Sequence, residues 1–458
     1  MSAEAAAAAD YAEPPKPYPS ARIGWLLVVL LTLAYIFSFV DRYILGLLIE
    51  PIKAEFGLSD RAIGYLLSAF TWVYGFVGIF MGWLVDRGRR TWIVAIGMGL
   101  WSAATVATGL AKNFGQLFAA RMGVGVGEAT LSPATFSMIG DSFPPEKRGK
   151  PIAFYSSALP IGAGIASLLS GAVIAWTAAS GSQSLPLFGE LSPWRFTLVI
   201  VGLPGLIFSA IFFFLREPVR RPSVAAPEVI GGSGFIDAVR YIGKNFMLYC
   251  GFVMVVCCMT AIAYSQGFLA PTFERTWGWS PELYATVNGI ALLVIGPLNM
   301  RIMGTISDRW TSSGTPDAAL RLMYIGFFIM VPTGAIPLFM PTAELAFVVL
   351  CLNTVGIGIV SAIGVTALLV ITPAQVRGQI VALYYLAISW FGSLGPIVVG
   401  ELSSNVFGEA DLRYAVAAVP IIFAIVPLAL MPTTKRLYRR QIERLGHSAD
   451  CAPRSKVP

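Results

Sequence analysis

Histidine and charged residues are scarce in this chain of 458 residues. Its single histidine is His447, near the end of the sequence, and charged residues make up 12% of the total. With one histidine, a histidine-based metal or catalytic site is not expected. A soluble domain is typically about one quarter charged, whereas 56% of this chain is hydrophobic and its mean hydropathy is +0.72. The sequence therefore predicts a protein with many membrane spans.

Two motif classes are also missing. The five cysteines show no metal-ligand spacing, and four of them, Cys250, Cys257, Cys258 and Cys351, lie in hydrophobic runs, so we interpret them as apolar packing residues. There is no Gly-x-x-x-x-Gly-Lys-Ser/Thr sequence, and no loop has the length of an ATPase domain. We therefore expect no metal, no cofactor and no nucleotide-driven pump. The net charge of +7 comes from short basic loops, so no nucleic-acid partner is expected either.

Long apolar runs dominate what is present. A membrane helix needs about 20 mostly apolar residues. Twelve segments meet this requirement, at 23–49, 62–85, 91–111, 114–139, 151–178, 194–215, 245–270, 283–307, 320–340, 343–371, 378–400 and 411–431. The predicted fold class is an all-α membrane protein whose twelve transmembrane helices form two six-helix bundles.

Polar stretches divide the chain. The first twenty residues contain no apolar run of signal-peptide type, so we expect a disordered cytoplasmic N-terminus rather than a cleaved leader. In the tail, basic residues alternate with apolar residues, which predicts a short helix on the membrane surface. The predicted order is an N-terminal segment (1–22), a six-helix bundle (23–215), a cytoplasmic linker (216–244), a second bundle (245–431) and the tail (432–458).

The loops predict an orientation. One set carries basic residues, among them Arg87, Lys147, Arg216, Arg309 and Arg377, and the other set is mainly acidic. By the positive-inside rule both termini lie in the cytoplasm. We expect a multi-pass protein of the cell membrane.

The two halves share short sequences. Gly82-Trp-Leu-Val-Asp86-Arg87 recurs as Gly304-Thr-Ile-Ser-Asp308-Arg309, and Pro144-Pro-Glu-Lys-Arg148-Gly149 recurs as Pro373-Ala-Gln-Val-Arg377-Gly378. Each pair follows the same ordinal helix of its half, which indicates an internal duplication. Parallel six-helix repeats are related by a pseudo-two-fold axis along the membrane normal and place the substrate path between them.

Ionisable residues occur inside two predicted helices. Asp41 and Arg42 lie in the first, and Arg121 and Glu128 lie seven residues apart in the fourth, separated by three glycines. Seven residues are about two helical turns, so Arg121 and Glu128 share a face, and glycines allow a close helix neighbour. Charges within a span are costly and are usually retained for function. The second half shows no matching charges and places Ser361 where the first has Glu128.

The motifs resemble a known family. The pattern Gly82-x-Leu84-x-Asp86-Arg87-x-x-Arg90 after the second helix resembles the major facilitator superfamily. Within that superfamily, Val40-Asp-Arg-Tyr43 and Gly125-Val-Gly-Glu-Ala129 resemble the Spinster family of lipid transporters. The resemblance implies a monomeric secondary transporter, driven by a proton gradient, that moves lysophospholipids or sphingoid-base phosphates by alternating access.

The four buried charges are the predicted centre of transport. A carboxylate balanced between desolvation and a nearby arginine can change its protonation state as the cavity opens to either side. We expect Asp41 and Glu128 to carry the proton, while Arg42 and Arg121 stabilise the charged state or bind an anionic headgroup. The alternative is a static ion-pair cluster that only joins the first and fourth helices.

The loop motifs predict a cytoplasmic gate. We expect Asp86 to accept hydrogen bonds from a helix N-terminus and to pair with Arg87 or Arg90 when that side is closed. Arg148 and Arg377 begin the fifth and eleventh helices and either cross-link the halves or act as positive anchors. The gate residues are Gly82, Asp86, Arg87, Arg90, Arg148, Asp308, Arg309 and Arg377.

Polar and aromatic residues of the second half are candidates for the cavity wall. They are Tyr264, Asn288, Asn353, Tyr384, Tyr385 and Trp390. Helix packing or contact with lipid is the alternative role for each.

Four other functions compete with lipid transport. Within transport, the alternatives are a proton-coupled symporter of a small organic anion, which would place polar groups on both sides of its cavity, and a drug efflux carrier; the other two competing functions lie outside transport. A membrane enzyme would need an intramembrane histidine or a nucleophile paired with a base, and the only histidine is in the tail. A transport-inactive sensor on the same fold is opposed by the intact Asp41, Asp86 and Glu128.

Overall fold

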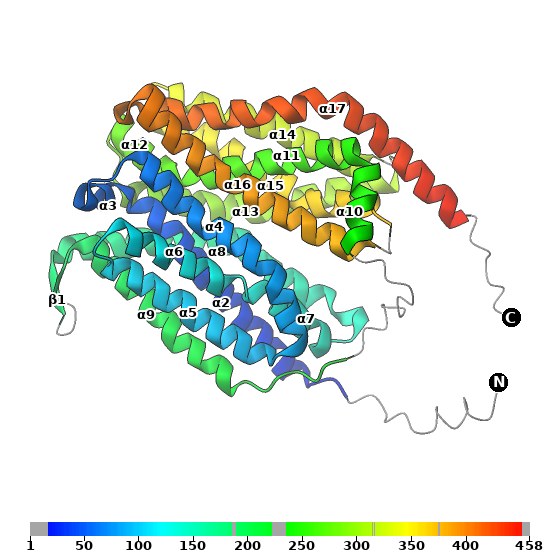
Figure 1. The fold of residues 1–458 in the computed structure, drawn as a ribbon, viewed down its shortest axis with the longest axis horizontal. Helices are drawn as coiled ribbons and strands as arrows, with labels where there is room; N and C mark the ends of the chain where they lie inside the picture. The colour runs from blue at the N-terminus through cyan, green and yellow to red at the C-terminus, as the bar shows by residue number, and fades with distance from the viewer. Residues whose placement is uncertain are drawn as a thin grey trace.

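The structure is a computed structural model, and it describes residues 17–185, 189–221, 235–313, 315, 317–373 and 376–450. Nearly all of this is helical, with the two halves of the chain packed side by side and the first and last described residues at the same end of the molecule (Figure 1). We call the opposite end, where α3 and α12 lie, the distal end.

The first half contains eight α-helices, a short 3-10 helix and one hairpin in the described residues. In order these are α2 (Ala21–Leu47), α3 (Ile49–Phe56), α4 (Asp60–Arg87), α5 (Arg90–Leu110), α6 (Phe114–Glu128), α7 (Leu131–Ser142), η1 (Pro145–Lys147), α8 (Gly149–Ser180), β1 (Gln183–Leu185), β2 (Gly189–Leu191) and α9 (Pro193–Phe214). The strands β1 and β2 are antiparallel, and Gln183 is opposite Leu191.

The second half begins inside the predicted linker. In order its elements are α10 (Phe235–Lys244), α11 (Phe246–Ser265), η2 (Gln266–Phe268), α12 (Leu269–Trp277), α13 (Pro281–Ser312), α14 (Ala318–Ala335), η3 (Ile336–Phe339), α15 (Ala343–Val370), α16 (Arg377–Leu402), η5 (Ser403–Phe407), η6 (Glu409–Asp411) and α17 (Leu412–Asp450).

The helices account for the predicted spans. Among the described residues, 10 helices are long and apolar enough to cross a membrane, and an eleventh is obtained if α4, which is bent, counts as one span. The fourth predicted span, 114–139, is divided between α6 and α7. The break lies at Ala129 and Thr130, where the Thr130 hydroxyl donates to the Gly127 carbonyl at 2.8 Å. The all-α class is confirmed.

The tail differs from its prediction. A separate surface helix was expected after 431, but α17 continues without interruption through Asp450 and bends where it leaves the bundle (Figure 1). Pro432 is the last proline within α17, and no glycine follows it until Gly446. Because these residues contain no strong helix breaker, the helix propagates into the tail.

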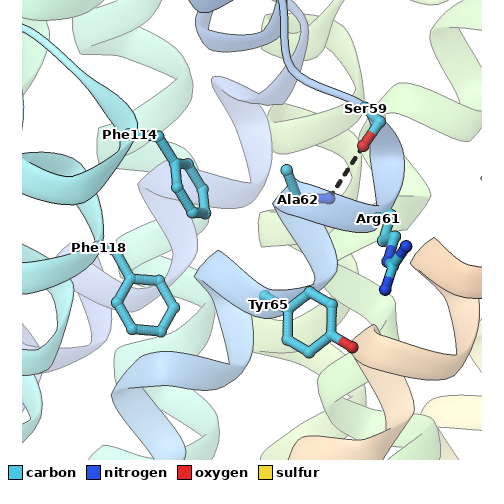
Figure 2. Close-up of a pocket in the computed structure, with 6 residues that line it drawn as sticks. All are labelled: Ser59, Arg61, Ala62, Tyr65, Phe114 and Phe118. Carbon is cyan, nitrogen blue, oxygen red and sulfur yellow. Dashed lines mark hydrogen bonds between the residues drawn. The ribbon is translucent and has the colours of Figure 1, made fainter.

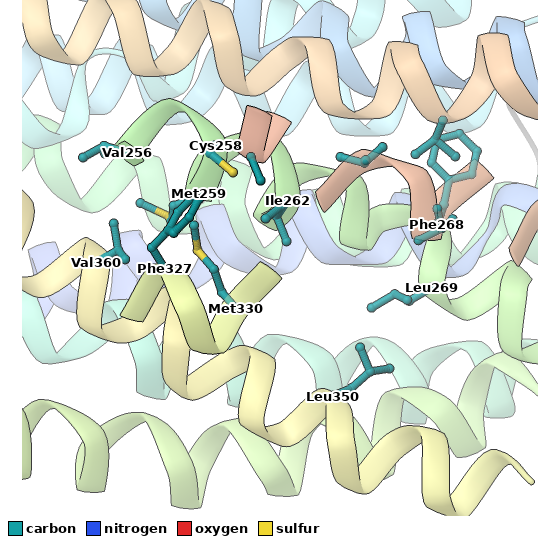
Figure 3. Packing of buried hydrophobic residues seen from close by; sticks show 14 of the residues in the cluster. Val256, Cys258, Met259, Ile262, Phe268, Leu269, Phe327, Met330, Leu350 and Val360 are labelled. Atoms are coloured by element: carbon teal, nitrogen blue, oxygen red, sulfur yellow. The ribbon is translucent and has the colours of Figure 1, made fainter. Parts of the chain in front are cut away.

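The largest apolar core lies mainly in the second half and extends to residues of the first, which also has a separate core. In the second half the core is built from α11, α14 and α15, with Cys258, Met259, Phe327 and Met330 packed together (Figure 3). Cys258 is 1% exposed within this cluster, in keeping with its predicted packing role.

The halves meet along α4 with α16 and along α8 with α13. The Ser68 hydroxyl donates to the Ser393 carbonyl at 2.6 Å, and the Ser167 hydroxyl donates to the Ala285 carbonyl at 2.7 Å. A Cβ on Gly164 would lie 2.9 Å from the Gly289 carbonyl oxygen, so glycine permits this close approach of α8 and α13.

Candidate functional site

An ion pair joins α2 and α6 inside the first half. The Nη2 atom of Arg42 lies 2.5 Å from Oε2 of Glu128, and its Nε atom donates to the same oxygen at 2.7 Å. The Ser38 hydroxyl, one turn earlier on α2, donates to this oxygen at 2.8 Å. The side chain of Glu128 is 1% exposed and that of Arg42 is 22% exposed. The predicted contact between the first and fourth helices is therefore present.

Asp41 and Arg121 lie beside this pair and are less completely bonded. Nη1 of Arg121 donates weakly to the Asp41 carbonyl at 3.4 Å, and the Thr105 hydroxyl of α5 neighbours the Asp41 carboxylate. Oδ1 of Asp41, Nε of Arg121 and Oε1 of Glu128 are buried without a protein hydrogen-bond partner. Buried polar atoms without partners are costly, so the cluster retains capacity to bind a proton or a polar group.

Aromatic rings surround the exposed side of Arg42. Its guanidinium carbon lies 4.8 Å from the ring centre of Phe70 and 5.2 Å from that of Tyr74, both on α4. Tyr35 of α2 stacks on Tyr155 of α8 at 5.0 Å, and both rings lie near Arg42. These rings favour a cation by their π faces and offer an apolar surface to a ligand.

The glycines of α6 position Glu128. A Cβ on Gly125 would lie 2.5 Å from the Phe70 carbonyl oxygen, and one on Gly127 would lie 2.5 Å from the Gly97 carbonyl oxygen. Helix α6 is therefore pressed against α4 and α5, which brings Glu128 within reach of Arg42.

Two residues of the predicted cavity wall face this cluster. Tyr264 of α11 lies near Arg42, and Tyr385 of α16 lies near Tyr74. Trp390 lies near Gly75 of α4, and Nδ2 of Asn288 donates to the Ser167 hydroxyl of α8 at 3.4 Å. All four lie where the second half meets the first.

Asn353 and Tyr384 occupy a different place from the predicted wall. Asn353 is 1% exposed, accepts a hydrogen bond from Gln266 at 2.9 Å and donates to the Met330 carbonyl at 2.6 Å. Tyr384 is 4% exposed beside Gly364. Both pack helices within the second half, because a buried amide or phenol finds its partners among neighbouring helices.

The second half contains a charge within a predicted span that was not among the predicted site residues. Arg301 lies on α13 within a segment that is apolar enough to span a membrane, and it is exposed. Its place near the end of that segment is typical of an arginine whose guanidinium reaches the interface.

The loop after α4 is bonded differently from the predicted gate. Arg90 is 1% exposed and pairs with Asp141 and with Glu217, its Nε lying 2.8 Å from Oε1 of Glu217. Among the described residues the carboxylate of Asp86 forms no ion pair, while its backbone carbonyl accepts from Arg220. In this conformation Arg90 therefore connects α5, α7 and the segment after α9, all in one half.

Arg148 and Arg377 occupy equivalent positions. Arg148 donates to the Phe143 carbonyl at 2.9 Å and Arg377 to the Thr372 carbonyl at 3.3 Å, each five residues earlier. Each bond stays inside its own half, and neither arginine cross-links the halves here.

The remaining predicted gate residues are Gly82, Arg87, Asp308 and Arg309. The guanidinium of Arg87 lies 4.6 Å from the Trp83 ring, and Gly82 lies one turn before Asp86. Arg309 is near the end of α13, and the side chain of Asp308 falls outside the described residues.

A network at the distal end was not predicted. Arg275 of α12 donates to both carboxylate oxygens of Asp60, at 2.7 and 2.9 Å, and to Glu50 at 2.6 Å. Lys53 pairs with Asp60 and lies 2.8 Å from Glu409. No sequence pattern indicates that these residues meet, because they come from segments far apart in the chain.

This network closes the distal end. All hydrogen bonds and ion pairs that join described residues of different halves lie in the distal part of the molecule. Those farthest from the distal end involve Ser68, Ser167 and Asn288. The halves are thus fastened at the end remote from the first and last described residues. Such one-sided closure is one of the two states that alternating access requires.

A shallow cavity of about 350 Å³ lies beside the network. Tyr65, Phe114 and Phe118 form its aromatic walls, and Arg61, at its rim, pairs with Glu401 (Figure 2). None of the four buried charges lines it. Among the described residues no group of histidine, cysteine, aspartate or glutamate has the arrangement of a metal site.

Comparisons with known proteins agree with this architecture. The model of the Major Facilitator Superfamily matches residues 31–396. An MFS-type efflux pump of Mycolicibacterium smegmatis is 29% identical over 89% of this chain and 91% of its own. The D-galactonate transporter of Escherichia coli O6:H1 is 25% identical over 91% of this chain and 97% of its own.

Spinster proteins are also similar. Protein spinster of Drosophila melanogaster is 27% identical over 57% of this chain, and the match spans 39% of that protein. The crystal structure of a bacterial homologue of the human lysosomal transporter Spinster, inward-facing and unoccupied, has a TM-score of 0.80 at 24% identity, covering 92% of this chain and 99% of that one. The chain belongs to the major facilitator superfamily of membrane transporters and is similar, within it, to the Spinster proteins.

Proposed function

We propose that the protein is a proton-coupled transporter of an anionic amphipathic lipid, such as a lysophospholipid or a sphingoid-base phosphate, and that it works by alternating access. The observation that supports this proposal most directly is the Arg42–Glu128 ion pair. The Glu128 side chain is buried, at 1% exposure, whereas the Arg42 side chain is 22% exposed. An arginine in this position can bind a phosphate with its planar fork while the paired carboxylate remains shielded.

Linkage between proton and cargo follows from this geometry. Protonation of Glu128 removes the charge that holds Arg42, and Arg42 is then available to an anionic headgroup. A headgroup on Arg42 in turn favours the protonated carboxyl, because both compete for one guanidinium. Asp41, whose Oδ1 has no protein partner, is the second carboxylate of the relay.

The distribution of polarity supports amphipathic cargo. The buried ionisable cluster belongs wholly to α2 and α6, whereas the second half presents Tyr264, Tyr385 and Trp390 toward the first. A headgroup would be bound by the first half and a hydrocarbon chain would lie against the aromatic residues of the second.

A small organic anion is the second candidate. It is supported by the similarity to the D-galactonate transporter over nearly the whole chain. Arg42 and Arg121 would bind a carboxylate as readily as a phosphate. The aromatic second half offers fewer partners for sugar hydroxyls, so we rank this candidate below lipid transport.

Proton flux in liposomes tests the proposal. Purified protein would be reconstituted and driven by a pH gradient, alone and with a lysophospholipid, a sphingoid-base phosphate or D-galactonate, for wild type, Glu128→Gln and Glu344→Gln. Glu344 is an exposed carboxylate outside the cluster and serves as the matched control. We expect lipid-stimulated flux in wild type and Glu344→Gln that is lost in Glu128→Gln.

Other results would redirect or refute the proposal. Stimulation by galactonate and not by lipid would establish the second candidate. Undiminished lipid-stimulated flux in Glu128→Gln would remove the proton role of that residue.

A further inference from the structure

A larger cavity lies near the end of the molecule that carries the first and last described residues. Its volume is about 790 Å³, and it is lined by residues 243–248, at the junction of α10 and α11, and by Leu437, Arg440, Gln441, Glu443 and Arg444 of α17. All of these belong to the second half and its tail. The cavity is therefore separate from the interface between the halves, where cargo would pass.

Its walls carry an excess of positive charge. Lys244 ends α10, and Arg440 and Arg444 are four residues apart on one face of α17; Glu443 is the single acidic side chain of the wall. All three basic side chains are exposed, and none forms an ion pair with a described residue. They are available to an external anion.

Neighbouring side chains have structural partners instead. Arg439 lies 2.7 Å from Asp317, and Gln441, which is 6% exposed, donates to the Tyr241 hydroxyl at 2.6 Å. The Tyr438 hydroxyl donates to the Ala367 carbonyl at 2.9 Å. Tyr438, Arg439 and Gln441 thus fix the tail helix against the bundle, while Arg440 and Arg444 line the cavity.

Backbone and apolar groups complete the wall. Asn245 precedes α11 without capping it by a side-chain hydrogen bond, and the first turn of α11 lines the cavity. A helix N-terminus attracts negative charge. Phe246 and Met247 are 58% and 53% exposed in the same wall.

The position of the cavity indicates its occupant. Phe246 is the first residue of a segment apolar enough to span a membrane, and α10 exposes Ile236 and Val239 beside Arg240. Exposed apolar and basic side chains in one short helix are typical of the membrane interface. A ligand here must therefore combine an anionic group with a hydrocarbon part that begins at the interface.

We propose that this cavity binds an anionic phospholipid of the adjacent leaflet, with its phosphate between Lys244, Arg440 and Arg444 and its acyl chains along Phe246 and Met247. The bound lipid would fasten the tail helix to the junction of α10 and α11. The site does not depend on the identity of the transported cargo.

Thermal unfolding of the full-length protein in detergent tests this site. The midpoint, followed by tryptophan fluorescence, would be titrated with dioctanoyl phosphatidylglycerol, dioctanoyl phosphatidylcholine and inorganic phosphate. The test variant is Arg440→Gln/Arg444→Gln. The matched control is Lys435→Gln/Arg436→Gln, which removes two exposed basic residues of the same helix outside the cavity. Arg42→Gln reports separately on lipid bound at the proposed transport site.

Phosphatidylglycerol should raise the midpoint of wild type, the matched control and Arg42→Gln. In Arg440→Gln/Arg444→Gln the half-saturating concentration should rise about tenfold, since each basic side chain near an anionic lipid contributes several-fold to binding. If that variant is unstable without lipid, Lys244→Gln on the opposite wall replaces it, and its response should weaken in the same direction.

Three outcomes would overturn the proposal. One is an equal response in the test and matched variants. The second is an equal shift with phosphatidylcholine, which would indicate apolar binding alone. The third is an equal shift with inorganic phosphate, which would indicate a simple anion site.

Discussion

Arg42 and Glu128 are 86 residues apart in sequence, yet two guanidinium nitrogens of Arg42 lie within 2.7 Å of one oxygen of Glu128. The second carboxylate oxygen of Glu128 has no protein partner. The pair is thus strong but incomplete, which suits a group that must release its counter-charge during a cycle.

Glu128→Gln should destabilise the protein more than Arg42→Gln/Glu128→Gln. The single change leaves a guanidinium without its counter-charge, and loss of one member of a buried pair costs about 3–5 kcal/mol. The double change removes both charges. Thermal unfolding midpoints should therefore fall most in Glu128→Gln and recover in part in the double variant, while proton-driven transport stays absent in both. A double variant less stable than the single one would show that the pair is not the dominant contact.

The distal network should control opening of that end. Asp60→Asn weakens the bond to Arg275, which joins the halves, and the bond to Lys53, which itself pairs with Glu409 of the second half. Spin labels at Ala54→Cys and Asn405→Cys, both exposed positions near the distal end, should report a second, longer distance in this variant. Native cysteines would be replaced beforehand.

Arg61→Gln is the matched control for this measurement. The Arg61–Glu401 pair also joins the halves, but its side chains are 54% and 33% exposed, and exposed pairs contribute only about 0–1 kcal/mol. We expect a distance distribution close to wild type. An Asp60→Asn distribution identical to wild type would exclude the network as a lock.

Gly127→Ala should be poorly tolerated. Its Cβ would approach the Gly97 carbonyl oxygen at 2.5 Å and Trp101 at 2.7 Å, so α6 and α5 must separate. Overpacking of this kind costs about 1–3 kcal/mol. We expect a lower unfolding midpoint and reduced transport, because Glu128 is the next residue. Gly140→Ala, where a Cβ meets nothing within 4 Å, should leave the midpoint unchanged or slightly raised. Equal effects of the two changes would contradict the close-packing argument.

The Asp317–Arg439 ion pair, which we call the tail anchor, should depend on pH only in the acidic range. Burial raises the pKa of Asp317, but hydrogen bonds from Arg439 and Arg321 outweigh burial and hold the pKa below its ordinary value of 3.8. A carboxylate with a depressed folded pKa contributes its full stability above the ordinary value and loses it as the pH falls through the folded value. The anchor should therefore persist at neutral pH and weaken below about pH 4.

Hydrogen exchange of residues 432–445 measures this anchor. Asp317→Asn should raise exchange in this segment at neutral pH, and wild type should approach the variant only in acid. Arg321→Gln is the control, because it leaves the Asp317–Arg439 bond intact. Slow exchange in Asp317→Asn at neutral pH would show that Tyr438 and Gln441 suffice to hold the tail.

Several features were predictable from local pattern alone. Long apolar runs required membrane helices, and the recurrence of Asp86-Arg87 as Asp308-Arg309 indicated two related halves. Residues 41, 42, 121 and 128 could be singled out from the sequence, because a charge within an apolar run is costly wherever the chain folds. The equivalent bonds of Arg148 and Arg377 to carbonyls five residues earlier reflect the same duplication.

Other features were not predictable in this way. Arg90 was expected to pair with Asp86 in its own loop. In the structure it is buried beneath the segment after α9 and pairs with Asp141 and Glu217 instead. In the sequence, an asparagine that lines a cavity cannot be distinguished from one that packs between helices. The hydrogen bonds in the structure show that Asn353 joins three helical segments of the second half.

The membrane class, the approximate limits of the spans and the presence of charges that must find partners are therefore predictable, because they follow from hydrophobicity and helical periodicity along a single stretch of chain. The identity of those partners depends on the tertiary structure. The Arg42–Glu128 pair, the Asp60–Arg275–Glu50 network and the basic cavity beside α17 each combine segments far apart in the chain. Their formation depends on helix contacts that leave no periodic signal in the sequence.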